Sequence, residues 1–145
     1  LPLVRQHQLP AGSIKFELTE SVLADQPERL QRLLARCREQ GVKTSLDDFG
    51  TGYASLAYLS QLPFDQLKID QSFVRALGTS ERALEVARTV VQLGQHLGME
   101  VIAEGVETEA QRDLLLAMGC ERFQGYLFSR PLPAGECRAW LQAHR

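Results

Sequence analysis

The stretch QLKIDQSFVRALGTSERALEVARTVVQLGQHLGMEVIAE, residues 66–104, holds the pattern that decides the fold. At each end lies a short segment in which apolar and polar residues alternate, and between them lies a long segment with apolar residues at helical spacing. Ser80 is a typical residue for the start of that helix, and Gly98 is typical for its end. A strand, a helix and a strand in this order predict two parallel strands joined by a right-handed crossover.

The rest of the chain continues this alternation of strands and helices. We predict five strands, at residues 13–18, 43–47, 66–70, 100–103 and 122–125. Thr108 and Gln111 form a capping box, which predicts the start of the helix before the last strand. A final helix carries Trp140, and we interpret this side chain as a packing residue.

Two architectures fit parallel strands with crossover helices: an open doubly wound sheet and part of a (β/α) barrel. In residues 66–70, Leu67 and Ile69 alternate with Lys68 and Asp70, whereas a strand covered by helices on both faces is a nearly continuous apolar run. One apolar face toward the helices and one polar face toward a barrel interior explain the alternation more simply. We therefore predict an α/β fold with about five βα units of a barrel.

The composition is that of one ordinary globular domain. The chain has 145 residues, 44% of them hydrophobic, and a formal net charge of −2. This charge balance lacks the basic stripe of a protein that binds duplex nucleic acid and the polybasic patch of a membrane-surface module. No apolar run approaches the roughly 18 residues of a membrane span. We therefore expect no duplex nucleic acid partner and no membrane contact for this segment.

The cysteines and histidines do not form a metal-binding pattern. Cys37, Cys120 and Cys137 include no CxxC pair, and the three histidines are scattered along the chain. We interpret the cysteines as buried thiols in a reducing compartment, which predicts a cytoplasmic location.

Acidic residues follow nearly every predicted strand. They are Glu17 and Glu20 at the first strand, Asp47 and Asp48 at the second, Asp70 at the third, and Glu104 and Glu107 at the fourth, while Lys68 lies within the third and Gln124 ends the fifth. The carboxyl ends of parallel strands lie at the same end of a barrel, so these side chains should converge on one rim. Glu20, Asp48 and Glu107 also have a simpler interpretation, because an acid after a strand is often only a helix N-cap.

Converging carboxylates repel one another, by about 4 kcal/mol for one pair at 4 Å and an effective dielectric constant of 20. Either some of them are protonated or a cation lies among them. Oxygen ligands without nearby histidine or cysteine select hard divalent ions such as Mg²⁺ or Mn²⁺. The pattern therefore favours a divalent-metal site, in which Lys68 suits a substrate phosphate or the orientation of a water molecule.

The segment after the second strand contains two glycines within three residues. Phe49, Gly50, Thr51 and Gly52 follow Asp48 and are typical of a flexible loop. The segment is neither a Walker loop nor a GxGxxG motif. We interpret it as a mobile flap beside the acids.

Several motifs together resemble the EAL family of cyclic di-GMP phosphodiesterases. They are FELTES at 16–21, DDFGTGY at 47–53, LKID at 67–70, AEGVET at 103–108, and GC at 119–120 followed by QGY at 124–126. The motifs occur in the family's order and cover nearly the whole chain. The resemblance implies that residues 1–145 are the C-terminal portion of one EAL domain, with the fold of the C-terminal part of a modified (β/α)₈ TIM-type barrel.

The resemblance also implies a reaction, in which two Mg²⁺ or Mn²⁺ ions support hydrolysis of cyclic di-GMP to linear pGpG. It assigns Glu17, Asp47, Asp48 and Glu104 to the metals, with Asp47 bridging both ions. It further makes Glu104 the usual candidate for the base and Lys68 the residue that orients the attacking water, with Asp48 also catalytic. It gives Glu20 the task of holding the loop at 48–53, and makes Asp70, Glu107 and Gln124 substrate-binding or supporting residues.

The sequence departs from the family pattern in one large respect, because it contains no Glu-Ala-Leu motif and no following strand with the expected Asn ligand. A (β/α)₈ barrel has about 250 residues, so we expect the N-terminal barrel strands to be absent from this chain. Two open sheet edges then favour a homodimer or other self-association. A sensory or GGDEF domain can precede the segment in the parent protein, which can itself be membrane-anchored.

Three functions remain at this point. The first is the phosphodiesterase, for which the chain alone should be weak or inactive. The second is a degenerate receptor module that binds cyclic di-GMP without hydrolysing it. The third is a scaffold element without a ligand.

Overall fold

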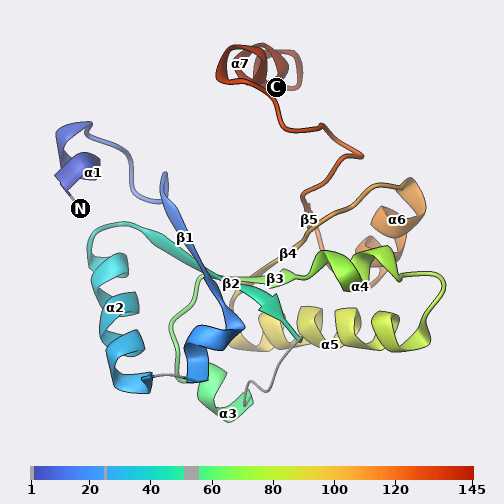
Figure 1. The fold of residues 1–145 in the computed structure, drawn as a ribbon, viewed down its shortest axis with the longest axis horizontal. Helices are drawn as coiled ribbons and strands as arrows, with labels where there is room; N and C mark the ends of the chain where they lie inside the picture. The colour runs from blue at the N-terminus through green and yellow to red at the C-terminus, as the bar shows by residue number, and fades with distance from the viewer. Residues whose placement is uncertain (1, 25, 51–55) are drawn as a thin grey trace.

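The computed structural model describes residues 2–24, 26–50 and 56–145. Strands and helices alternate through these residues (Figure 1). In chain order the elements are α1 (Pro2–Gln6), β1 (Lys15–Thr19), the 3₁₀ helix η1 (Glu20–Ala24), α2 (Pro27–Glu39), β2 (Lys43–Phe49), α3 (Leu56–Leu59), β3 (Gln66–Ile69), α4 (Gln71–Arg75), α5 (Glu81–Leu97), β4 (Glu100–Ala103), α6 (Glu109–Ala117), β5 (Arg122–Phe123) and α7 (Ala134–Ala143).

The strands form one parallel sheet in the order β1-β2-β3-β4-β5. The prediction of parallel strands joined by helices is therefore confirmed. The strand positions also agree with the sequence pattern, except that β1 is shifted toward Thr19, β2 continues two residues further to Phe49, and β5 has only two residues. Since all five strands run in one direction, their carboxyl ends lie along one edge of the sheet.

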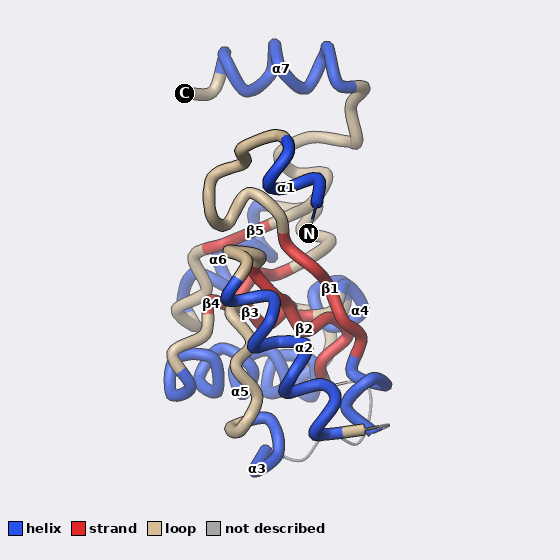
Figure 2. The backbone as a smooth tube through the Cα atoms, turned by 90° about the vertical axis from the view of Figure 1, so that its left-hand side faces the viewer, coloured by secondary structure: helices blue, strands red, loops and turns tan. Residues whose placement is uncertain are grey.

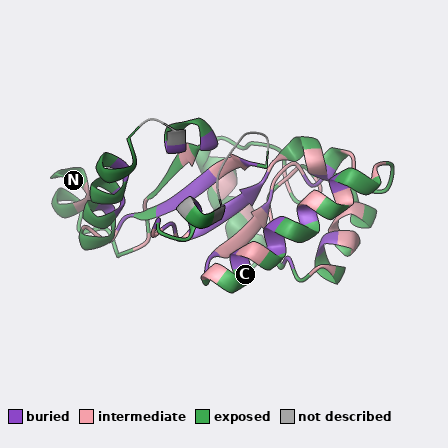
Figure 3. Cartoon of the chain, turned by 90° about the horizontal axis from the view of Figure 1, so that it is seen from below, coloured by how far each residue is buried: buried purple, intermediate pink, exposed green. Residues whose placement is uncertain are grey.

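The core lies between one face of the sheet and the helices that cover it. Leu67 and Ile69 of β3 are fully buried and belong to the same cluster as Val90 and Val91 of α5. Figure 1 shows α5 running along the sheet, and Figure 3 shows buried residues concentrated in the central strands and on the helix surfaces that face them. The predicted apolar strand face is thus the one covered by helices.

The predicted helix ends are confirmed. The Ser80 hydroxyl accepts a hydrogen bond from the Ala83 N–H at 3.2 Å, and Gly98 ends α5 with a φ of 67°. Thr108 and Gln111 form both hydrogen bonds of the capping box at the start of α6. These local signals position the strands that follow each helix.

The last helix is present as predicted and lies apart from the rest of the fold. Helix α7 contains no buried residue, and both Figure 1 and Figure 2 show it standing apart from the sheet and the other helices. The Trp140 ring stacks on His144, with ring centroids 4.2 Å apart, within the same helix. Trp140 is half-buried and packs on a side chain of its own helix, so its packing against another element stays a prediction.

The pairing of β2 with β3 contains one irregularity. Leu46 pairs with Leu67, but Phe49 pairs with Ile69, so Asp47 and Asp48 together lie opposite the single residue Lys68. One extra residue in β2 forms a bulge, and bulges interrupt the alternation of side chains along a strand. Because of the bulge, Asp47 and Asp48 need not point to opposite faces of the sheet, as neighbouring residues of a regular strand do.

Two smaller expectations concern the thiols and the membrane. Cys37 and Cys120 are buried as predicted, whereas Cys137 is only half-buried. Burial raises the pKa of both buried thiols. Among the described helices, none has both the length and the apolar character that crossing a membrane would require.

Candidate functional site

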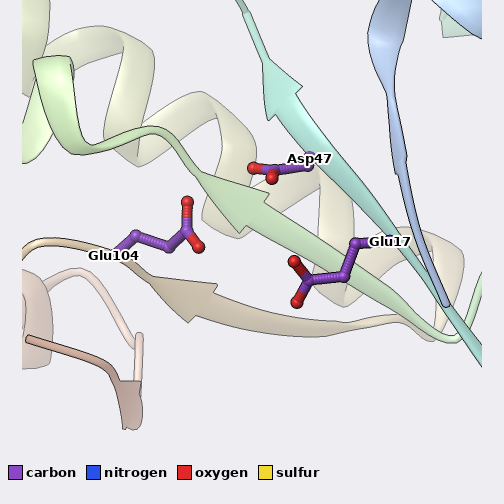
Figure 4. A group of neighbouring side chains, drawn as sticks. All are labelled: Glu17, Asp47 and Glu104. Carbon is purple, nitrogen blue, oxygen red and sulfur yellow. The ribbon is translucent and has the colours of Figure 1, made fainter. Parts of the chain in front are cut away.

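Three carboxylates from three strands converge at the carboxyl edge of the sheet. Glu17 belongs to β1, Asp47 to β2, and Glu104 directly follows β4. Each contributes a carboxylate oxygen, and these oxygens all lie within 4.8 Å of one another. Figure 4 shows the three side chains pointing toward a common space. The predicted convergence of acids is therefore present in the structure for these residues.

A buried lysine lies among the three carboxylates. The Lys68 ammonium nitrogen is 2.8 Å from Glu17 Oε1 and 3.8 Å from Asp47 Oδ2, and it forms an ion pair with Glu104 Oε1. Only 3% of the Lys68 side chain is exposed, compared with 47% for Glu17. Three negative charges thus surround one positive charge, and the cluster keeps a net negative charge.

The pKa shifts in this cluster follow from burial and from the lysine. Burial alone would lower the pKa of Lys68, but the hydrogen bonds to Glu104 and Glu17 outweigh it and raise the pKa above its ordinary value. Burial raises the pKa of Glu104, and the charge of Asp47 adds to that rise, while Lys68 opposes it. Lys68 is therefore an ammonium ion at neutral pH, and Glu104 binds a proton more readily than an exposed glutamate does.

Asp48 occupies a separate place beside this cluster. Its φ of 58° is in the left-handed region, which aspartate tolerates better than most residues, and its N–H donates to Asp47 Oδ1 at 2.8 Å. Within the described residues, the group of three close carboxylates does not include Asp48. Burial raises the pKa of Asp48, and Asp47 and a hydrogen bond with Asp70 raise it further.

Asp70 caps a helix as well as contacting Asp48. Its Oδ2 accepts hydrogen bonds from the Ser72 N–H at 2.8 Å and from the Ser72 hydroxyl, at the start of α4. Burial by itself would raise the pKa of Asp70, but the hydrogen bonds from Ser72 outweigh it and lower the pKa. Asp70 therefore remains a carboxylate that orients both α4 and Asp48.

A cavity of about 390 Å³ adjoins Glu104 at the same edge of the sheet. Its lining residues are Gln71, Arg75, Glu104, Gly105, Glu107, Gln124, Gly125 and Tyr126. The structure thus brings together three residues that the sequence analysis selected: Glu104, Glu107 and Gln124. A Cβ atom at Gly125 would lie 2.1 Å from the Val106 carbonyl oxygen. Only glycine therefore allows the Gln124 segment to approach the loop after β4 so closely.

The sequence analysis did not select Gln71, Arg75 or Tyr126, which also line the cavity. One signal was available for two of them. Gln71 and Arg75 are four residues apart in the helix that begins directly after β3, so both project from one helix face at the carboxyl edge of the sheet. Arg75 brings a positive charge, and Tyr126 an aromatic ring on which Arg130 lies at 4.7 Å from the ring centroid.

The remaining predicted residues lie around the bulge. Glu20 begins η1 and is buried, with 8% of its surface exposed. Phe49 is part of the core, and Gly50 has a φ of 94°. Thr51 and Gly52 lie outside the described residues, so the predicted action of Glu20 on the loop at 48–53 stays a prediction.

The arrangement can hold a hard cation and stabilise negative charge. The three clustered donors are all carboxylate oxygens, which suit Mg²⁺ or Mn²⁺ better than softer metals. The adjoining cavity offers amide, guanidinium and aromatic groups, which suit a ligand with both phosphate and ring systems.

Comparison with known protein families gives one clear match. The family model described as "EAL domain" matches residues 1–131. The chain is also 46% identical over 142 residues to the cyclic di-GMP phosphodiesterase NbdA of Pseudomonas aeruginosa. This match covers 98% of the chain but only 18% of NbdA, so the chain spans less than a fifth of this curated relative.

Solved structures agree with the match. The EAL domain of Mycobacterium smegmatis DcpA is 41% identical, with a TM-score of 0.92 over 99% of this chain and 65% of that chain. Klebsiella pneumoniae BlrP1, in a complex with manganese and cyclic di-GMP, is 34% identical, with a TM-score of 0.80 over 88% of this chain and 33% of that chain. The predicted fold class is therefore confirmed: the five parallel strands and their helices match TIM-type barrel structures over part of their length.

Proposed function

The chain belongs to the EAL domain family, and from this membership we propose that it is the C-terminal portion of one EAL domain. The complete domain is proposed to be a metal-dependent phosphodiesterase that hydrolyses cyclic di-GMP to linear pGpG. The observation that carries the proposal is the meeting of Glu17, Asp47 and Glu104 around Lys68, beside a cavity at the same sheet edge. Cyclic di-GMP is the ligand of BlrP1 in its manganese complex and the substrate named for NbdA.

A divalent ion fits the residues that are present. The cluster consists of oxygen donors only, and one ammonium balances only part of three carboxylate charges. We assign Glu17, Asp47 and Glu104 to the metal, which they would hold through carboxylate oxygens, and Asp48 would support it from beside this group. When bound, Mg²⁺ or Mn²⁺ supplies Lewis-acid stabilisation of the charge that builds up on the phosphodiester oxygens.

Glu104 and Lys68 are the residues that would deprotonate and orient the attacking water. Glu104 accepts the proton of the attacking water, a task that suits a carboxyl group whose pKa is raised by burial. Lys68 donates a hydrogen bond that orients the same water, since its ammonium lies within reach of Glu104. Glu104 lines the cavity, and Lys68 forms an ion pair with Glu104, so both groups would lie beside a phosphodiester bound there.

The surrounding residues bind and orient the nucleotide. Glu107 and Gln124 line the cavity and offer hydrogen bonds to a guanine or ribose. Asp70 orients Asp48, and Glu20 supports the loop that includes Phe49, Gly50, Thr51 and Gly52. These assignments depend on side-chain chemistry and on placement at the carboxyl edge of the sheet.

A receptor that binds cyclic di-GMP without cleaving it is the second function to test. The cavity that Gln71, Arg75, Glu107 and Gln124 line would serve binding alone as well as hydrolysis.

The test is a hydrolysis assay on the full-length protein that carries this chain, with binding of cyclic di-GMP measured in parallel. We expect Mg²⁺- or Mn²⁺-dependent formation of pGpG, and Glu104→Gln should lose at least about 10²-fold in turnover while it still binds the nucleotide. Glu85→Gln is the matched control, because Glu85 is an exposed residue of α5 that forms an ion pair with Arg88 of the same helix. Binding without hydrolysis would favour the receptor, and neither binding nor hydrolysis would refute both functions.

A further inference from the structure

The position of Lys68 has a consequence for metal binding. In the structure its ammonium contacts Glu17 and Glu104 and lies 3.8 Å from Asp47, so it touches or approaches every carboxylate of the cluster. With 3% of the side chain exposed, water contributes little to its solvation. The ammonium is therefore solvated chiefly by the same oxygens that are assigned to the metal.

We propose that Lys68 is the resident cation of this site in the absence of metal, and that a divalent ion binds among Glu17, Asp47 and Glu104 only by displacing the ammonium from at least one of them. The inference rests on the proposed metal site and adds a role for Lys68 that comes before catalysis. It makes Lys68 a positioning residue for the carboxylates and a competitor of the metal.

The competition follows from the small size of the cluster. The three oxygens lie within 4.8 Å of one another, and Mg²⁺ requires its oxygen ligands at about 2.0–2.1 Å. An ion that bonds these oxygens lies close to any ammonium that keeps its hydrogen bonds to them. Two cations at so short a distance repel each other, and the burial of the Lys68 side chain limits how far water screens that repulsion. A metal ion bound to these oxygens and an ammonium that keeps all its contacts with them therefore exclude each other.

Displacement also connects metal binding to the proposed reaction. Without metal, the ammonium protons are directed at Glu17 and Glu104. If a divalent ion were bound to those oxygens, at least one N–H of the Lys68 ammonium would be available to donate to another oxygen nearby. Lys68 would thus be free to orient the attacking water only when the metal is in place.

The first test measures Mn²⁺ affinity of the full-length protein and of variants, without any assay of activity. Lys68→Met has nearly the same length and no charge, so it should bind Mn²⁺ at least about tenfold more tightly than the wild type. Lys68→Arg keeps the charge and should bind no more tightly than the wild type. Lys15→Met is the matched control, because Lys15 is exposed and its ammonium donates to Gln66 Oε1 at 2.9 Å, while among the described residues no ion pair joins it to the carboxylates.

Each outcome of this binding test has a definite meaning. Equal or weaker Mn²⁺ binding by Lys68→Met would overturn the inference while leaving the metal site intact. An equal gain in Lys15→Met would assign the effect to net charge and would overturn the inference too. If the wild type and Lys68→Met both bind no Mn²⁺, the proposed metal site itself is refuted.

The second test is a titration of the wild type and does not depend on Lys68→Met. A buried ammonium exchanges its protons slowly, so the ¹⁵N resonance of the Lys68 side chain can be followed in the wild type while Mg²⁺ is added. Its assignment comes from its loss in Lys68→Arg. We expect the resonance to shift or to disappear into fast exchange at saturating Mg²⁺. An unchanged resonance at saturation would overturn the inference, even if Lys68→Met fails to fold.

Discussion

Leu67 and Ile69 face the helices from β3, whereas Lys68 between them faces three carboxylates, although all three residues are buried. On the first face, apolar side chains pack against α5 without an electrostatic penalty. On the second, one ammonium is held among three negative charges. The difference shows that equal burial within one strand can have opposite effects on stability.

The apolar face stabilises the fold, because removal of apolar surface from water is favourable at about 25 cal/mol per Å². The charged face is different, since desolvation of ions offsets much of the attraction between them. A cluster with three carboxylates and one ammonium keeps unbalanced repulsion. The charged face is therefore best explained by the chemistry it supports, and changes on it should affect turnover more than stability.

The largest effect is expected from Asp47→Asn on the charged face. This change removes a proposed metal ligand and should lower turnover of the full-length protein by at least about 10²-fold. The metal-free protein should unfold at an equal or slightly higher temperature, because one repelling charge is gone. Steady-state kinetics and thermal melting in a chelator measure the two effects. A marked loss of stability would show that the charged face also holds the fold together.

Leu67→Ala should have the opposite profile. Leu67 is fully buried, so its truncation should lower the free energy of unfolding by about 2–5 kcal/mol. Turnover per folded molecule should change little, since the side chain points away from the carboxylates. Leu33→Ala is the control, because Leu33 in α2 is 45% exposed and its truncation should be nearly neutral. Denaturant unfolding checks both, and equal losses in the two variants would contradict the assignment of the core to this face.

The local features of both faces could be predicted from the sequence. The alternation in β3 separated Leu67 and Ile69 from Lys68, and single residues such as Ser80 and Gly98 marked the ends of α5, as the structure confirms. These features depend on neighbours within a few positions, so the sequence holds the needed information. The convergence of Glu17, Asp47 and Glu104 followed from a topological rule for parallel strands.

The features that were missed depend on contacts between distant segments. The bulge at Asp47 and Asp48 arises from the register of β2 against β3, which no local pattern reveals. The cavity that includes Arg75 arises where α4 meets the segments after β4 and β5. For Trp140, periodicity predicted an apolar helix side but not what covers it. Register, cavities and partners of a helix are properties of the assembled fold.

A smaller effect should separate metals of different size on the charged face. With Ca²⁺ in place of Mg²⁺, we expect turnover to fall by about tenfold or more, because Ca²⁺ accepts longer bonds and more ligands and so misplaces the attacking water. Metal-dependent stabilisation, measured by thermal melting, should still be present, since Ca²⁺ also binds carboxylate oxygens. Equal rates with the two ions would contradict the proposed positioning role of the metal.

The smallest effect concerns Asp48, whose pKa is raised by burial and by its acidic neighbours. A carboxyl group with a raised pKa binds a proton more readily in the folded state than in the unfolded state. Its negative charge therefore lowers stability at neutral pH, and this penalty disappears as the pH falls through the raised pKa toward the ordinary one. Asp48→Asn removes the charge and keeps a residue that tolerates the left-handed backbone.

In a chelator, Asp48→Asn should thus raise the melting temperature of the full-length protein at pH 7 by a small amount, and the rise should shrink as the pH is lowered toward 4. Asp113→Asn is the control, because Asp113 lies on the exposed side of α6 and pairs with Arg112. It should give no rise at pH 7. A gain in Asp48→Asn that is the same at every pH would mean that the asparagine stabilises the bulge itself, for example through its left-handed backbone preference. Charge repulsion between Asp48 and its neighbours would then not be what lowers the melting temperature of the wild type.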